Sequence, residues 1–352
     1  MMLSLLRRTD TVTSEARDVM SAAESDPGTT TPPAVIGDAD DGRARRRGQP
    51  LIGLALGAGA ARGWSHIGVL RELAEQGIHP DIIAGTSIGA VVGGCYAAGR
   101  LDAIETFARS LTRRRVFTLM DLSFSGASLI TGERLKAALE QELDSFTIEE
   151  LPIPFAAVAT EVGTGHEVWL QQGPLAHAIR ASYALPGIFE PVRVGDRWLF
   201  DGALVNPVPV TVCRALGAEF VIAVNVTADT MYRARVIHDA ATAKKAAEAG
   251  PFAEKPDISL IDRILPRYFD RQQGDAPNVA TAMIDAFNII QDRILRSRLA
   301  GDPPDATITA RMEDIGMFDF HKADQLINVG RSAAKRALPN IFAHIPIPGA
   351  TA

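Results

Sequence analysis

The sequence predicts an α/β fold in which a mainly parallel β-sheet is covered by helices on both faces. Two observations lead to this prediction. Short apolar runs that lack a polar face alternate along the chain with amphipathic segments of helical period. The chain also has 352 residues, of which 47% are hydrophobic and 22% charged, so it can bury a large core.

The individual elements follow from the apolar runs and from the helical periodicity. The short apolar runs predict strands at residues 51–56, 81–84, 155–160, 168–170 and 220–226. The first helix has apolar residues every three positions from Trp64 to Leu73, and Gly77 is its expected C-cap. Further helices are predicted at 88–98 and from Val279 to Ile294. Thr131 can cap a helix that extends to Leu143. Another helix would have Asn206 as its N-cap and Pro207 at N1, and would extend to Leu216.

Two parts of the chain interrupt the alternation. Residues 1–48 have the composition of a disordered tail, and the arginines at 43–47 either contact anionic lipid or are simply solvated. Residues 228–276 read as an insertion, whose apolar stripe at 260–268 is typical of a lid, a membrane-facing helix or a helix docked on the core. We therefore expect one domain at 49–340 and a C-terminal tail at 341–352.

Charge and cysteine content exclude several classes of protein. A net charge of −6 argues against a nucleic-acid binder that works by neutralising phosphates. Cys95 and Cys213 are the only cysteines, which excludes a disulfide scaffold and a four-cysteine zinc site and favours a reducing, cytoplasmic location. Because Arg7 and Arg8 follow the first apolar residues at once, no secretory signal is expected, and no segment has the pattern of a transmembrane span.

The first chemical motif is G-x-S-x-G at 85–89, between a predicted strand and a predicted helix. In that setting Ser87 lies on a tight strand-to-helix turn, and Gly85 and Gly89 leave room for the turn. The helix N-terminus beneath it favours developing negative charge. The motif therefore predicts a serine nucleophile, with a serine that merely caps the helix as the alternative.

The second motif is a glycine-rich loop, Gly57 to Gly63, directly after the first strand. Such a loop offers several backbone N–H groups at a helix start and can bind a phosphate or an oxyanion. Neither the dinucleotide nor the phosphate-loop fingerprint is complete, because Arg62 replaces the third glycine and Trp64 and Ser65 follow Gly63. An oxyanion hole is the better interpretation, and a plain strand-to-helix turn is the alternative.

The third motif is Asp201-Gly202-Ala203, which follows an apolar segment. An aspartate at the end of such a segment can reach a buried site and either accept the Ser87 proton or orient a base. Asp-Gly is also a common turn, so this motif is weak by itself.

Taken together in this order, the three motifs resemble those of the patatin-like phospholipases, especially the small bacterial subgroup. The resemblance continues through residues 132–135, 179–191 and 303–305 to a closing helix near 323–337. It covers most of residues 51–340, apart from the insertion.

The resemblance implies a modified α/β-hydrolase-like fold, a three-layer α/β/α sandwich, with a Ser–Asp dyad. Ser87 would be the nucleophile and Asp201 the base, with Gly85, Gly89 and Gly202 supporting their turns. The implied oxyanion-hole residues are Gly57, Gly59, Ala60, Arg62 and Gly63. Residues 180–191 would form the floor and wall of an acyl site. The implied reaction is hydrolysis of a phospholipid or lysophospholipid ester through an acyl-enzyme, with no metal and no other cofactor.

Several alternatives remain open at this stage. A Ser–Asp–His triad would need a downstream histidine, for which His238, His321 and His344 are the candidates. His66 is expected to be packed rather than catalytic. An acyltransferase would use the same dyad, and a non-catalytic adaptor or regulator would keep the motifs. A nucleotide-binding α/β protein would use the loop from Gly57 to Gly63, but the incomplete fingerprints disfavour it. Contact with the inner membrane face would be peripheral, and the oligomeric state is open.

Overall fold

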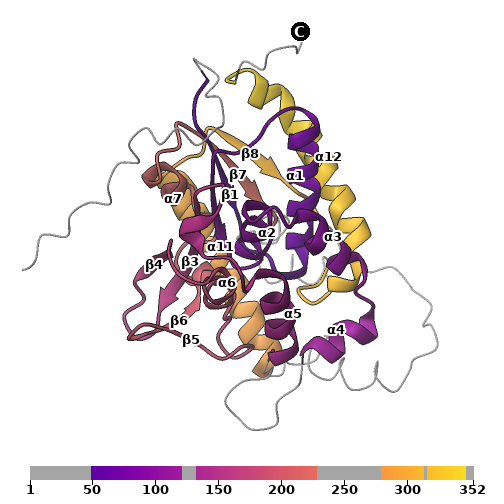
Figure 1. Ribbon diagram of the computed structural model, residues 1–352, viewed down its shortest axis with the longest axis vertical. Helices are drawn as coiled ribbons and strands as arrows, with labels where there is room; N and C mark the ends of the chain where they lie inside the picture. Colours follow the sequence, from indigo (N-terminus) through magenta and orange to yellow (C-terminus); the bar gives the residue numbers. More distant parts are fainter. Residues whose placement is uncertain (1–48, 121–131, 228–278, 313–314, 346–352) are drawn as a thin grey trace, which may run out of the picture. The chain divides into compact units, whose positions relative to one another are not determined.

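A computed structural model describes residues 49–120, 132–227, 279–312 and 315–345 (Figure 1). Thr131 and the predicted tail and insertion, at 1–48 and 228–276, lie outside these ranges. The strands are β1 (Ile52–Leu56), β2 (Ile82–Thr86), β3 (Phe155–Glu161), β4 (Glu167–Leu170), β5 (Val192–Val194), β6 (Arg197–Asp201), β7 (Phe220–Asn225) and β8 (Ala306–Thr309).

The described strands form one sheet with the order β5-β6-β3-β2-β1-β7-β8, and β4 pairs with β3. The pairs from β3 through β2, β1 and β7 to β8 are all parallel. The antiparallel pairs are confined to one end, where β4 and β6 pair with β3 and β5 pairs with β6. The predicted mainly parallel sheet is therefore confirmed, and its central strands are buried along their whole length.

The helices pack on both faces of this sheet. They are α1 (Ser65–Glu75), α2 (Ile88–Ala97), α3 (Leu101–Arg109), α4 (Arg113–Met120), α5 (Glu133–Leu143), α6 (Leu175–Ser182), α7 (Val210–Ala215), α11 (Val279–Gly301) and α12 (Ala323–Phe342). Short 3₁₀ turns are η1 (Ala60–Trp64), η2 (Ile148–Glu150), η3 (Gly202–Leu204) and η5 (Phe320–Lys322).

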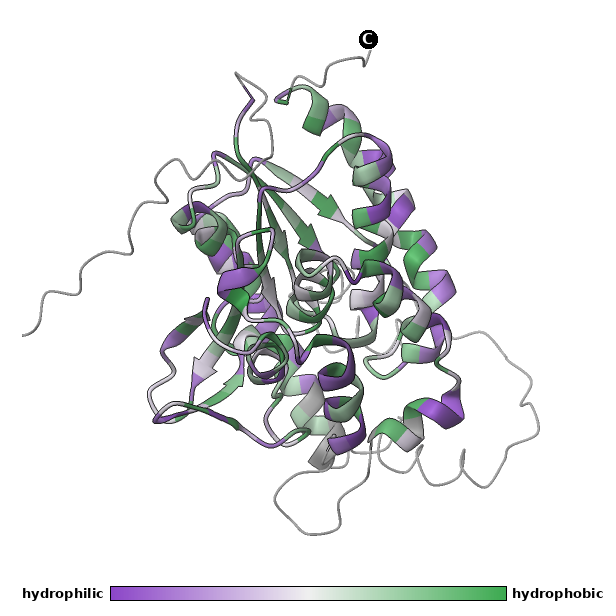
Figure 2. Ribbon diagram, in the orientation of Figure 1, coloured by the Kyte–Doolittle hydropathy of each residue, from purple (hydrophilic) through white to green (hydrophobic). Residues whose placement is uncertain are grey.

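Two separate apolar cores define the three layers. Leu54 and Leu56 of β1 point into a core shared with α1, α2 and α12. Ala55, between them, points to the other face, where α7 and Leu295 of α11 complete a second core. Figure 2 shows hydrophobic colour along the central strands and alternating colour along α12, as expected for a buried sheet and an amphipathic covering helix. The three-layer α/β/α arrangement agrees with the expected fold.

Helices α1 and α12 pack very closely because each has a glycine at the crossing. A Cβ added at Gly68 would lie 1.9 Å from the Ile327 carbonyl oxygen, and one added at Gly330 would lie 1.9 Å from the Ser65 carbonyl oxygen. The two backbones therefore touch where other helix pairs have side chains.

We expect Gly68→Ala to lower the free energy of unfolding by about 2 kcal/mol or more, because the added methyl forces the helices apart. Gly301→Ala is the control, since a Cβ there meets nothing within 4 Å. It should change stability by no more than about 0.5 kcal/mol. Urea denaturation monitored by circular dichroism measures both, and an equal effect of the two substitutions would contradict the packing argument.

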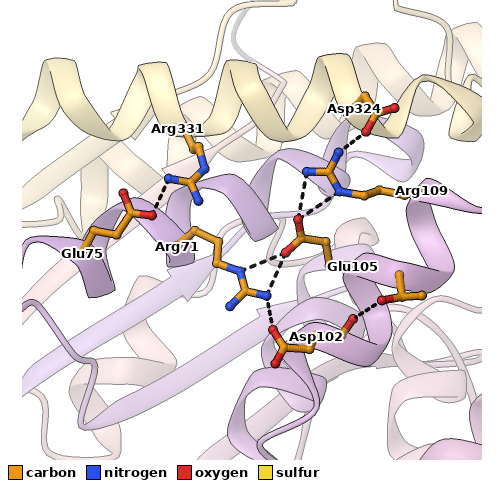
Figure 3. Close-up of polar contacts among 8 residues, drawn as sticks. Arg71, Glu75, Asp102, Glu105, Arg109, Asp324 and Arg331 are labelled. Carbon is orange, nitrogen blue, oxygen red and sulfur yellow. Dashed lines mark hydrogen bonds and ion pairs between the residues drawn. The ribbon is translucent and has the colours of Figure 1, made fainter.

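A charged network fixes α3 against α1 and α12 (Figure 3). Arg71 of α1 binds Asp102 and Glu105 of α3, and Arg109 of α3 binds Glu105 and Asp324 of α12. These pairs are partly exposed, so each stabilises the fold only modestly, but together they orient α3.

Two sequence expectations are wrong in detail. The helix predicted to start at Asn206 begins at Val210, because Pro209 disfavours helical geometry at the residue before it. Asn206 is instead buried, and its amide donates to Glu167 and Thr211. The domain also extends beyond residue 340, since α12 continues to Phe342 and Ile341 and Ile345 are buried. None of the helices in the described ranges is long and apolar enough to cross a membrane.

Candidate active site

Ser87 lies on the sharp turn between β2 and α2. Its backbone has φ 57° and ψ −124°, a positive-φ conformation that non-glycine residues rarely adopt. The turn is possible only because α2 packs directly on the end of β1. A Cβ added at Gly89 would lie 2.2 Å from the Leu56 carbonyl oxygen, and one at Gly85 would lie 2.5 Å from the Ala90 Cα. The two glycines of the motif therefore permit a close backbone approach.

The Ser87 side chain does not cap α2, although the residue occupies the N-cap position. Its hydroxyl donates instead to Asp201 Oδ2 at 2.7 Å. The alternative interpretation of Ser87 as a simple helix cap is therefore contradicted. Ser87 is 9% exposed, so the hydroxyl is reachable but largely shielded from water.

The sheet order explains why residues 114 positions apart meet. Thr86, at the end of β2, pairs with Val158 of β3, and Ala159 of β3 pairs with Asp201 of β6. The two side chains thus emerge beside the same stretch of β3. The backbone of Asp201 is held on both sides, since its N–H donates to the Ala184 carbonyl and its own carbonyl accepts from the Thr160 hydroxyl.

The Asp201 carboxyl group is buried and only partly compensated. It is 3% exposed, and it accepts one bond from Ser87 and one from the Ala203 N–H, which reaches Oδ1 at 2.8 Å. Burial disfavours the charged form and raises the pKa of Asp201 to about 7, although both hydrogen bonds oppose this shift. A carboxylate with this pKa is suited to exchange protons near neutral pH.

The glycine-rich loop engages most of its backbone N–H groups in hydrogen bonds with other parts of the chain. The N–H groups of Gly57, Ala58 and Ala61 donate to the carbonyls of Val224, Pro207 and Met317, respectively. The backbone N–H of Arg62 donates to the Gly59 carbonyl. The Arg62 guanidinium donates to the Ile315 carbonyl.

In the described part of the chain, the N–H groups of Gly59 and Ala60 have no such acceptor. Ala60 also has a left-handed backbone, with φ 49°, which turns the chain at this point. Of the residues expected from sequence to form an oxyanion hole, Gly59 and Ala60 therefore have N–H groups without an acceptor among the described residues. The Gly57 N–H is bonded to the Val224 carbonyl. Gly63 is needed for packing, because an added Cβ there would lie 2.1 Å from the Ile88 side chain.

Ser182 of α6 lies in the block expected to line an acyl site, but the sequence assigns it no specific role. Its hydroxyl is fully buried, accepts from the Ser87 N–H at 2.9 Å and donates to the Val158 carbonyl at 2.6 Å. It thereby holds the strained Ser87 backbone onto β3. The sequence does not predict this contact, because it depends on where α6 packs.

His66 and the two described triad candidates, His321 and His344, have partners other than Ser87 and Asp201. His66 is fully buried, as expected, and contacts the Gly57 carbonyl at 2.7 Å. Burial lowers its pKa to about 4, so it is neutral at physiological pH. His321 interacts with Arg113, and His344 with the Asn340 carbonyl. His238 lies outside the described residues.

An apolar cavity of about 320 Å³ begins at Ser87 and Asp201. It follows one face of α2, which places Ser87, Val91 and Cys95 along its wall at helical spacing. The other walls come from α3, α4, α5 and the 183–189 segment, within the 180–191 block expected to line an acyl site. The charged network of Figure 3 thus orients a helix, α3, that forms part of this wall.

Comparison with known proteins identifies the family of this chain. Residues 54–214, which include both Ser87 and Asp201, match the family model described as patatin-like phospholipase. An uncharacterized NTE family protein of Mycobacterium bovis is 36% identical over 338 residues, covering 84% of this chain and 93% of that protein. The chain belongs to the patatin-like phospholipase family.

Two longer relatives carry family-related descriptions. A patatin-like phospholipase domain-containing protein of Caenorhabditis elegans is 39% identical over 185 residues, covering 50% of this chain and 13% of that protein. Lysophospholipase NTE1 of Mycosarcoma maydis is 37% identical over 188 residues, covering 52% of this chain and 10% of that protein. Membership of the patatin-like phospholipase family supports a lipid hydrolase.

Proposed function

We propose that the protein is a serine acyl hydrolase that cleaves a carboxylic ester of a phospholipid or lysophospholipid with Ser87 and Asp201. The main support is the 2.7 Å hydrogen bond between the Ser87 hydroxyl and the Asp201 carboxylate at the start of an apolar cavity. The cavity suits an acyl chain, because its walls are mostly hydrophobic and its volume lies in the range of small-molecule sites. The lysophospholipase among the relatives supports the substrate class.

The proposed reaction has two halves joined by an acyl-enzyme. Asp201 takes the hydroxyl proton while Ser87 Oγ bonds to the ester carbonyl carbon. The N–H groups of Gly59 and Ala60, with the N-terminus of α2, stabilise the oxyanion. The ester C–O bond then breaks, and the alcohol leaves with the proton from Asp201. Water attacks the acyl-serine, gives a proton to Asp201, and Ser87 departs and recovers that proton.

This proposal predicts a single acidic limb in the pH profile of the reaction. Asp201 must be ionised to accept the serine proton, and its pKa is raised to about 7. The value of kcat/KM for a soluble ester should therefore rise with pH through about 7 and level off above it. Initial rates between pH 5 and pH 9 measure this. A profile already flat from pH 5 would contradict Asp201 as the base.

Lipid products test the substrate class. The purified protein should release free fatty acid from lysophosphatidylcholine or phosphatidylcholine vesicles, as measured by mass spectrometry. The Ser87→Ala variant is the matched control. Formation of a new ester with an added alcohol, without free fatty acid, would instead favour the acyltransferase. Access to such substrates requires contact with a membrane surface, which we propose is peripheral.

A further inference from the structure

A second, much smaller pocket meets the apolar cavity at Ser87 and Asp201. Its volume is about 30 Å³, and it extends under α11 rather than along α2. Gly59, Ala60, Ser87 and Asp201 line it together with Asn288 and Gln291 of α11. A single water needs at least about 10–15 Å³, so this pocket has room for about two waters and not for a lipid headgroup.

Gln291 is the unusual residue of this pocket. It is only 5% exposed, and its amide has no hydrogen-bond partner among the residues that the structure describes. Because Gln291 lines the pocket and its amide has no partner among the described residues, the amide is free to bond to a molecule that enters the pocket. Asn288, one turn earlier, is half-buried and adds a second amide to the same pocket.

The position of α11 is fixed relative to the loop that carries Asp201. The Arg298 side chain donates to the Val205 carbonyl at 3.1 Å and to the Glu167 carboxylate at 2.9 Å. Glu167 also accepts from Asn206, whose own carbonyl binds the Thr86 hydroxyl beside Ser87. These contacts hold Gln291 in a defined place relative to both site residues.

We propose that this pocket holds the water that hydrolyses the acyl-enzyme and that Gln291 is the positioning residue for it, an inference that rests on the proposed function. The water donates one hydrogen to Asp201 and is oriented by the Gln291 amide. Its oxygen bonds to the acyl carbon, its proton passes to Asp201, and the bond from that carbon to Ser87 Oγ breaks. Ser87 then recovers the proton. A pocket of this size favours water over a bulky alcohol acceptor.

Gln291→Met tests the proposal, because methionine has the same length but no amide. For a p-nitrophenyl ester, slower deacylation lowers kcat and KM together and leaves kcat/KM unchanged, since kcat/KM reports acylation only. We expect kcat and KM to fall about tenfold, kcat/KM to stay within about twofold, and the initial burst to approach one product per active site. Ile290→Ala, at an exposed position on the same helix, should change neither constant.

Two results would overturn the inference. A fall in kcat/KM would mean that the pocket serves acylation or the leaving alcohol, and unchanged kinetics would mean that Gln291 plays no part. A second variant, Gln291→Ala, guards against a folding defect in the first. Hydroxylamine can replace water as the nucleophile, so it should accelerate deacylation of Gln291→Ala more than deacylation of the wild type. An equal acceleration of the two proteins would count against the water site. If wild-type protein gives no acyl-enzyme at all, the proposed function fails instead.

Discussion

Asp201→Asn is expected to lower kcat by about 10⁴-fold while the protein remains folded. The asparagine amide fills the same space and can still accept the Ser87 hydroxyl hydrogen bond, but it cannot take the proton. Steady-state hydrolysis of a soluble ester measures the loss. Thr160→Val is a useful comparison, because it removes only the hydrogen bond to the Asp201 carbonyl and should cost far less activity. Wild-type turnover in Asp201→Asn would exclude Asp201 as the base.

The same variant should be more stable than the wild type at alkaline pH. The folded-state pKa of Asp201, about 7, lies above its ordinary value of 3.8. The folded state therefore binds the proton more tightly, and wild-type stability falls as pH rises from about 4 to about 7. Asparagine does not titrate, so the Tm advantage of the variant should grow across this window and stay constant above it. A difference in Tm that is independent of pH would contradict the raised pKa.

Ser87→Ala is expected to remove activity by about 10⁴- to 10⁶-fold, because no other hydroxyl occupies its place on the turn. It should also abolish labelling by a fluorophosphonate, which reacts with activated serines. The matched control is Ser182→Ala, whose hydroxyl binds the Ser87 N–H and does not contact Asp201 in the structure.

Ser182→Ala should therefore retain labelling at a reduced rate, since the nucleophile is present but less firmly held. Unchanged labelling of Ser87→Ala would mean that the reactive serine lies elsewhere. The two variants together separate the nucleophile from its support.

Much of the fold could be predicted because local signals and tertiary structure agree. The buried strands are short and apolar, and glycines mark the ends of the helices beside them, as at Gly77 and Gly99 with their positive φ. The turn at Ser87 could be recognised because its glycines are required by a close backbone approach. Where local signals compete, prediction was less successful: Asn206 and Pro207 resemble a helix start, but Pro209 delays the helix.

The site was harder to complete from sequence. Asp201 follows a common type of turn, and only the antiparallel pairing of β6 with β3 brings it to Ser87. Which loop N–H groups are free depends on their partners on other elements, so Gly57 and Gly59 cannot be distinguished by motif. Ser182 and Gln291 come from helices whose packing positions are set by the whole core. Their positions beside the site are visible only in three dimensions.

The most direct test of the dyad is to trap the acyl-enzyme and locate the acyl group. Wild-type protein mixed with a slowly hydrolysed p-nitrophenyl ester is quenched in acid, digested and analysed by mass spectrometry. The account predicts one acyl group per chain, attached to Ser87, and none in Ser87→Ala or Asp201→Asn under the same conditions. Ester turnover with an acyl group on another residue, or with equal acylation in Asp201→Asn, would contradict it.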